Sequence, residues 1–136
     1  MEEIKAEEVL SVGVEFFNDV KWELISHNKI NKDGFLKIRS KYKKVFATFL
    51  GAQDQLSFFM FKPISWPEYK EIRSTEMSKY DVHDYVIKKC LLWPIIDETN
   101  ISSLEAGTAL TLVYQILAQS SFLKDPSQAL QMVIEI

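Results

Sequence analysis

One seven-residue run in the middle of the chain, Leu56-Ser-Phe-Phe-Met-Phe-Lys62, limits the possible folds more than any other segment. The run is too short for a helix, is rich in aromatic side chains and ends at Pro63, and these features are typical of a β-strand. A strand has to pair with another strand, and the sequence offers one weak candidate partner, Leu91–Ile96. If no partner exists within the chain, the strand leaves an edge open to another subunit.

Helical spacing of apolar residues dominates the N-terminal part. Between Glu2 and about His27, apolar side chains recur every three to five positions, and a turn-forming segment at 28–34 follows. The same spacing predicts a second amphipathic helix over Gly34–Leu50, which ends at Gly51. We therefore expect residues 1–50 to form a pair of helices.

Three later helix starts carry Ser or Asp followed three residues on by an acid, which is the spacing of an N-terminal cap. They are Ser65 with Glu68, Asp81 with Asp84, and Ser102 with Glu105. The first helix is expected to reach about Met77, and the second is expected to close near Leu91 because Pro94 follows. The third is apolar on nearly all sides, so we expect it to be the central core helix.

These signals together predict a mainly α fold, a compact bundle of about five to six helices with one short strand or hairpin. The length of 136 residues predicts a single domain over 1–136. Within it, the helical pair of 1–50 is followed by a central segment at 56–122. A short C-terminal helix is expected in 123–136, with Pro126 at its first position and Val133 among its apolar residues.

The charge is unevenly distributed along the chain. The whole molecule carries a formal net charge of −3, which argues against general electrostatic binding of nucleic acid. Segment 29–44 nevertheless holds seven Lys or Arg residues against the single acid Asp33. This run can be a solvated helix face, a patch that docks an acidic partner (the chain's own glutamate-rich start included), or a nucleic-acid site. The last option is the least supported, because no Arg-rich or Gly-rich pattern interleaves with the aromatic residues.

Signals for export, membrane insertion and disulfide bonding are missing from the sequence. The N-terminus is acidic and lacks the apolar run of a signal peptide, and no window approaches eighteen continuous apolar residues. A single cysteine excludes an internal disulfide. We therefore expect a protein that is neither exported nor held in a membrane.

The search for catalytic chemistry gives little. His27 and His83 are the two histidines, and neither has a flanking ligand pattern. Cys90 falls on roughly the same helical face as His83, but its apolar surroundings favour an inert buried thiol. No phosphate-binding glycine motif occurs, and Asp97–Asn100 lacks the spacing of a calcium loop. We expect no catalytic, metal-binding or cofactor-binding residues, and no enzyme.

The central segment contains three motifs in a fixed order. They are Phe59-Met-Phe61-Lys62-Pro63-Ile64-Ser65 with Glu68-Tyr69-Lys70, then Val86-Ile87 with Cys90 and Trp93-Pro94, then Ala106-Gly107 with Ser120-Ser121-Phe122. In this order they resemble small tail and baseplate assembly proteins of tailed bacteriophages, especially contractile-tailed ones. The resemblance covers about half of the chain. The chain departs from the family pattern in two places: Ser121 stands where Gly is usual, and the dipeptide Trp66-Pro67 is a local variant.

The resemblance implies a non-enzymatic role with other phage tail or baseplate proteins as partners, in a hetero- or homo-oligomeric assembly. The protein would be a structural component of the virion tail or baseplate hub, or a transient assembly chaperone in the host cytoplasm; we prefer the virion component. A nucleic-acid-binding accessory protein that uses residues 29–44 is the alternative from another class. Because aromatic residues concentrate at binding hot spots, our candidate interface residues are Phe59, Phe61, Trp66 and Trp93, with a buried core position as the alternative for each.

Overall fold

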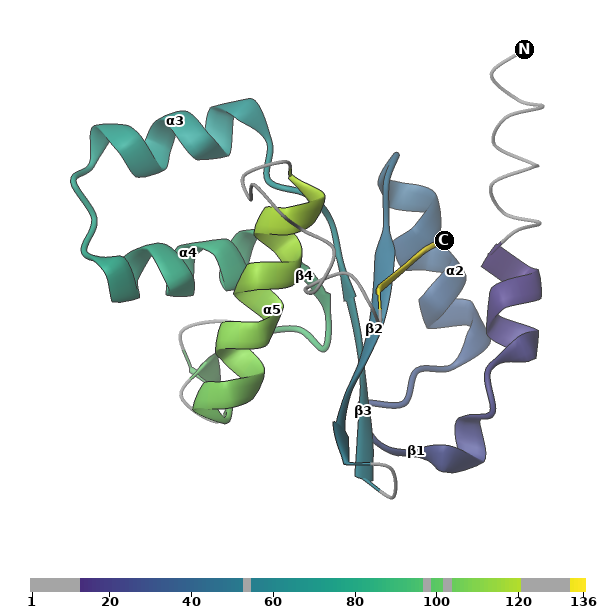
Figure 1. Ribbon diagram of the computed structural model, residues 1–136. Helices are drawn as coiled ribbons and strands as arrows, with labels where there is room; N and C mark the ends of the chain where they lie inside the picture. Colours follow the sequence, from purple (N-terminus) through teal and green to yellow (C-terminus); the bar gives the residue numbers. More distant parts are fainter. Residues whose placement is uncertain (1–12, 53–54, 97–98, 102–103, 121–132) are drawn as a thin grey trace, which may run out of the picture.

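A mixed β-sheet forms the middle layer of the computed structural model (Figure 1). The structure describes residues 13–52, 55–96, 99–101, 104–120 and 133–136. Within these residues five strands form one sheet; they are β1 (Ile25–His27), β2 (Phe46–Ala52), β3 (Gln55–Phe61), β4 (Leu91–Trp93) and β5 (Val133–Glu135). The strand order is β1-β3-β2-β5, and β4 also pairs with β3.

The predicted strand is confirmed as β3, and it lies inside the sheet rather than at an open edge. One edge pairs antiparallel with the whole of β2, from Phe46 opposite Phe61 to Ala52 opposite Gln55. The other edge is shared by β1, which runs parallel, and β4, which runs antiparallel. The weak partner candidate Leu91–Ile96 is therefore confirmed in its first three residues. The main partner of β3 is β2, which the sequence did not predict as a strand.

The β2–β3 hairpin depends on a glycine. Gly51 has a φ of +123°, and a Cβ atom at this position would collide with the backbone oxygen of Gln55. Any residue with a side chain would be strained here. The prediction that Gly51 ends a helix is therefore wrong. Gly51 instead allows the backbone near the end of β2 to pass close to Gln55 at the start of β3.

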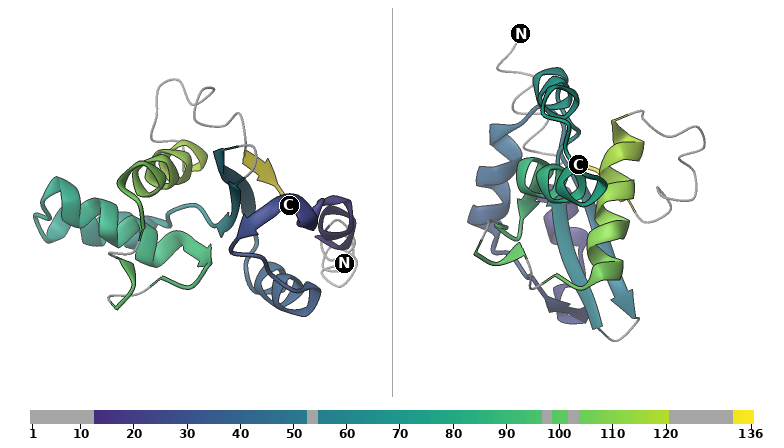
Figure 2. Two further views of the ribbon diagram at one scale, coloured as in Figure 1. Left: turned by 90° about the horizontal axis from the view of Figure 1, so that it is seen from below. Right: turned by 90° about the vertical axis from the view of Figure 1, so that its left-hand side faces the viewer.

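Helices cover both faces of the sheet (Figures 1 and 2). The helical segment 13–19 and α2 (Lys32–Lys41) pack on one face, while α4 (Lys79–Cys90) and α5 (Ala106–Gln119) pack on the other. Along β3 the side chains alternate between the two layers. Phe58 and Met60 belong to the core on the α2 side, and Phe59 and Phe61 belong to the core on the α4–α5 side. All four are buried, so both faces of the sheet are apolar.

The expected mainly α bundle with one short strand is therefore wrong. Residues 46–52, expected to end a helix and begin a loop, form β2, and Ile25–His27, expected to end another helix, forms β1. A strand that is buried on both faces is apolar at nearly every position, so its residues also satisfy helical spacing. The expected C-terminal helix is wrong at Val133–Glu135, which is β5, while its earlier part lies outside the described residues, as does the start of the first helix.

The later helices begin close to their predicted starts. Both hydrogen bonds of the capping box at Ser65 and Glu68 are present, and α3 (Trp66–Ser74) follows, slightly shorter than predicted. The cap of α4 is Ser78, whose Oγ accepts from the Asp81 N–H, so this helix begins before the predicted start. Ser102 lies outside the described residues, but α5 begins only at Ala106, with Glu105 as an N-cap whose side chain makes no capping hydrogen bond, so the predicted capping box of Ser102 and Glu105 is wrong. One face of α5 is buried, but Leu110 and Tyr114 are exposed, so it is not buried on all sides.

One member of the basic run is a core residue. The Arg39 side chain on α2 is 4% exposed, its Nε donates to the Ile136 carbonyl oxygen at 2.7 Å, and its Nη1 donates to the Tyr42 carbonyl oxygen at 2.8 Å. Burial lowers the pKa of Arg39, and the nearby charge of Glu135 partly offsets this effect. Arg39 therefore ties the chain beyond β5 to α2 and does not belong to the exposed basic face.

Candidate protein-interaction surfaces

The residues with catalytic potential do not form a reactive centre in the described part of the chain. Cys90 is fully buried at the end of α4, and burial raises the pKa of its thiol to about 12. The prediction of a buried thiol is confirmed. His83 is half-buried on the same helix, whereas His27 is exposed at the end of β1. Among the described residues, no group of three or more His, Cys, Asp or Glu side chains could hold a metal ion.

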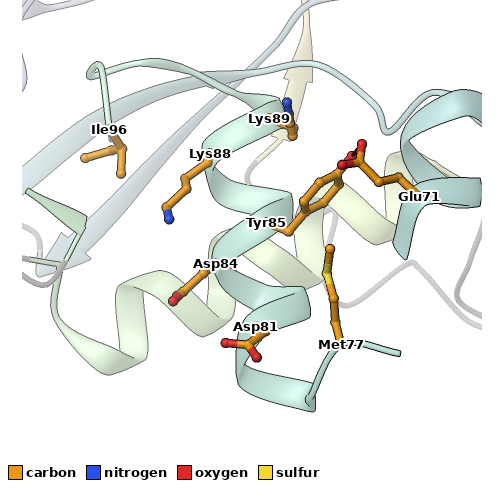
Figure 3. Close-up of a pocket in the computed structure, with 8 residues that line it drawn as sticks. All are labelled: Glu71, Met77, Asp81, Asp84, Tyr85, Lys88, Lys89 and Ile96. Atoms are coloured by element: carbon orange, nitrogen blue, oxygen red, sulfur yellow. Dashed lines mark hydrogen bonds between the residues drawn. The ribbon is translucent and has the colours of Figure 1, made fainter. Parts of the chain in front are cut away.

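A charged groove lies between α3 and α4 (Figure 3). Its volume is about 660 Å³, and its lining residues are Glu71, Met77, Asp81, Asp84, Tyr85, Lys88, Lys89 and Ile96. Figure 3 shows Asp81, Asp84, Tyr85 and Lys88 projecting from α4, with Glu71 reaching across from α3. Carboxylates and ammonium groups therefore line the same groove and partly compensate one another.

Contacts of Tyr85 inside this groove join α3 to α4. The Tyr85 hydroxyl donates to Glu71 Oε2 at 2.8 Å, and Lys89 Nζ lies 5.7 Å from the centroid of the Tyr85 ring. Desolvation and the Glu71 carboxylate raise the pKa of Tyr85 from its ordinary value of 10.0 to about 12, which moves the ionisation of the phenol even further above neutral pH. A protonated phenol bound to a carboxylate joins α3 to α4 but offers no nucleophile.

The second candidate is an exposed aromatic group on α3, which has no buried residue. Trp66 is 66% exposed and stacks on Tyr69 with ring centroids 5.6 Å apart, and Lys70 Nζ lies 5.8 Å from the centroid of the Trp66 ring. We call Trp66, Tyr69 and Lys70 the α3 aromatic face. A large indole ring that remains mostly in water is a feature of binding surfaces rather than of cores.

An ion pair at the end of β3 fixes the start of α3. Lys62 Nζ lies 2.8 Å from Glu68 Oε1, and the Ser65 N–H donates to the same oxygen at 2.9 Å. Burial acts to raise the pKa of Glu68, but the hydrogen bonds from Lys62 and Ser65 outweigh it and lower the pKa. Because these contacts fix the first turn of α3, which contains Trp66, they hold the α3 aromatic face in a defined position relative to the sheet.

The third candidate is a groove of about 460 Å³ between α2, the last turn of α4 and the segment that follows it. Four lysines line it, Lys37 and Lys41 from α2 and Lys88 and Lys89 from α4. The other lining residues are Gly34, Ile38, Tyr42, Leu91, Leu92, Trp93, Ile95 and Ile96. We call this site the basic groove. None of its described lining residues is acidic.

Of the four predicted interface residues, two are buried in the core and two are at least partly exposed. Phe59 and Phe61 are 2% and 0% exposed and belong to the core, so this fold does not present them to a partner. Trp66 lies in the α3 aromatic face. Trp93 is half-buried, its Nε1 donates to the Asn28 carbonyl oxygen at 2.7 Å, and it lines the basic groove.

Sequence reasoning missed the basic groove as a site. The run 29–44 was visible, but Lys88 and Lys89 lie far away in the sequence. Only the packing of α4 against the sheet brings them beside Lys37 and Lys41. Arg39, which was predicted to lie on the exposed basic face, is instead buried in the core.

Comparison with models of protein families found no match. Comparisons with curated proteins and with solved structures also found none. In the described residues, every helix is too short or too polar to cross a lipid bilayer.

Proposed function

We propose that this chain is a non-enzymatic, protein-binding component of a bacteriophage tail or baseplate. The exposure of Trp66 at 66%, stacked on Tyr69 and capped by Lys70, is the observation that supports contact through the α3 aromatic face. This face lies within the first of the three motifs that resemble phage tail and baseplate assembly proteins: Tyr69 and Lys70 belong to that motif, and Trp66 is its local variant.

The energetics favour Trp66 as the anchor of such a contact. A Trp side chain buries roughly 150–250 Å² when it is covered, and about two thirds of that area is still available here. At about 25 cal/mol per Å², covering it would contribute roughly 2.5–4 kcal/mol before the entropy of association is subtracted. The stack with Tyr69 and the fixed start of α3 reduce the side-chain entropy that binding would remove.

The main test is mass spectrometry of purified virions of a phage that encodes this chain, with affinity capture of the tagged chain from infected cells. A structural component is expected in the particles and in complex with tail or baseplate proteins. Capture of tail proteins without presence in the particles would support the transient chaperone instead. If captured material contains no tail or baseplate protein, the proposal is wrong.

A further inference from the structure

We propose that the basic groove binds an acidic peptide segment that also carries aliphatic or aromatic side chains. The basic groove is a different surface from the α3 aromatic face, and this binding does not require a role in a phage particle. Two properties of the groove define the chemistry of the partner.

The first property is its charge. Lys37 and Lys41 are exposed and four positions apart, so they stand on the same side of α2. Lys89 also lines the groove from α4, and its Nζ lies near the Tyr85 ring in the charged groove, which it lines as well. Since no described lining residue is acidic, an anionic segment would meet several cations of two helices at once, which favours both its association and its orientation.

The second property is the apolar part of its lining. Ile38, Leu92 and Trp93 are half-buried lining residues, and Ile95, which also lines the groove, is 71% exposed. A purely anionic ligand would leave these surfaces in water, whereas a peptide with apolar residues between its acids would cover them. The groove therefore matches a mixed acidic and apolar sequence better than phosphate or polyglutamate.

The same observations disfavour nucleic acid as the occupant. Arg39, the one arginine of the basic run, is buried and engaged with two carbonyl groups. The indole N–H of Trp93 is bound to Asn28, and the ring is half-buried, so it is not a free platform for a base. The rest of the apolar lining is mainly aliphatic and offers little for base stacking.

The test is a selection of randomised 12-residue peptides displayed on yeast against the purified full chain. The variant Lys37→Glu with Lys41→Glu serves as the comparison. The variant Lys43→Glu with Lys44→Glu is the matched control, because it makes the same charge change in the same basic segment at exposed residues that do not line the groove. Circular dichroism establishes that each variant is folded, and Lys37→Gln with Lys41→Gln replaces the first variant if it is not.

We expect enriched peptides to contain several Asp or Glu residues interspersed with Leu, Ile, Phe or Trp. Their affinity should fall at least tenfold, and up to about a hundredfold, in the Lys37/Lys41 variant, and less than threefold in the Lys43/Lys44 control. Three results would each overturn the proposal: no enrichment, enriched peptides without an excess of acids, or equal loss in both variants. Tighter binding of a labelled 12-nucleotide single-stranded DNA than of the best peptide, with the same Lys37/Lys41 dependence, would assign the groove to nucleic acid instead.

Discussion

Replacement of Arg39 by Met tests the inward position of this side chain. Met keeps much of the apolar stem but removes the donors to the carbonyl oxygens of Ile136 and Tyr42. A hydrogen bond from a charged donor contributes about 1.5–3 kcal/mol, and a buried acceptor left without a partner adds a further cost. Removing the buried charge recovers part of this loss, because its desolvation disappears. We therefore expect Arg39→Met to reduce the free energy of unfolding by about 2–4 kcal/mol.

The assay is urea denaturation followed by circular dichroism and tryptophan fluorescence. With an m-value of roughly 2 kcal/mol per M, a loss of 3 kcal/mol would lower the midpoint by about 1.5 M. Lys37→Met is the matched control, because it removes one positive charge from an exposed position of the same helix. This control is expected to change stability by less than about 0.5 kcal/mol. If Arg39→Met behaves like Lys37→Met, Arg39 is on the exposed face and the described contacts are wrong.

Three further predictions follow from other contacts. Phe58→Ala and Phe59→Ala should each lower the free energy of unfolding by about 3–5 kcal/mol in the urea assay, because these neighbours on β3 fill the cores on opposite faces of the sheet. A small effect of either substitution would mean that the corresponding face of the sheet is not covered by helices. Glu68, with its lowered pKa, should stabilise the fold fully above its unfolded pKa of about 4.5 and progressively less as the pH falls through the folded pKa. Glu68→Gln should therefore weaken the protein more at pH 7 than at pH 3, and an equal loss at both would contradict the ion pair with Lys62. At pH 8 the thiol of Cys90 should react with a disulfide reagent roughly a thousandfold more slowly than in urea, because a pKa of about 12 leaves little thiolate; native reactivity near the unfolded rate would show an accessible cysteine.

Local signals in the sequence predicted the central part of the fold. Ser65 and Glu68 define a capping box through residues three apart, and the aromatic run before Pro63 is too short for a helix, so α3 and β3 could both be identified. The three-residue strand β4 forms the first half of the weak partner candidate Leu91–Ile96, which spans Pro94.

The sheet could not be predicted because its strands lack a distinctive period. In β2, Phe46 and Leu50 face one core while Ala47 faces the other, so the strand shows no polar alternation. The edge strands β1 and β5 have three residues each, which is too few for any periodic signal. Arg39 followed the pattern of an exposed basic face, and its partner Ile136 is ninety-seven positions away.

The sequence allowed single residues of the candidate surfaces to be proposed, but not how those residues combine into a surface. Trp66, Phe59 and Phe61 were chosen from the sequence for the same reason, since aromatic residues concentrate at binding hot spots. Only the packing of helices on the sheet shows that Phe59 and Phe61 are buried while Trp66 is exposed. The basic groove depends on residues from two helices that the sequence does not connect.

Affinity capture of the tagged chain from infected cells, compared between the parent and two variants, tests the proposed mode of action most directly. Trp66→Ala removes the proposed anchor, and Tyr80→Ala removes an aromatic residue that is 77% exposed in the first turn of α4 and lies outside the α3 aromatic face. We expect quantitative mass spectrometry to recover tail or baseplate proteins with the parent and with Tyr80→Ala, and at least tenfold less of them with Trp66→Ala. Equal recovery by Trp66→Ala would contradict binding through α3.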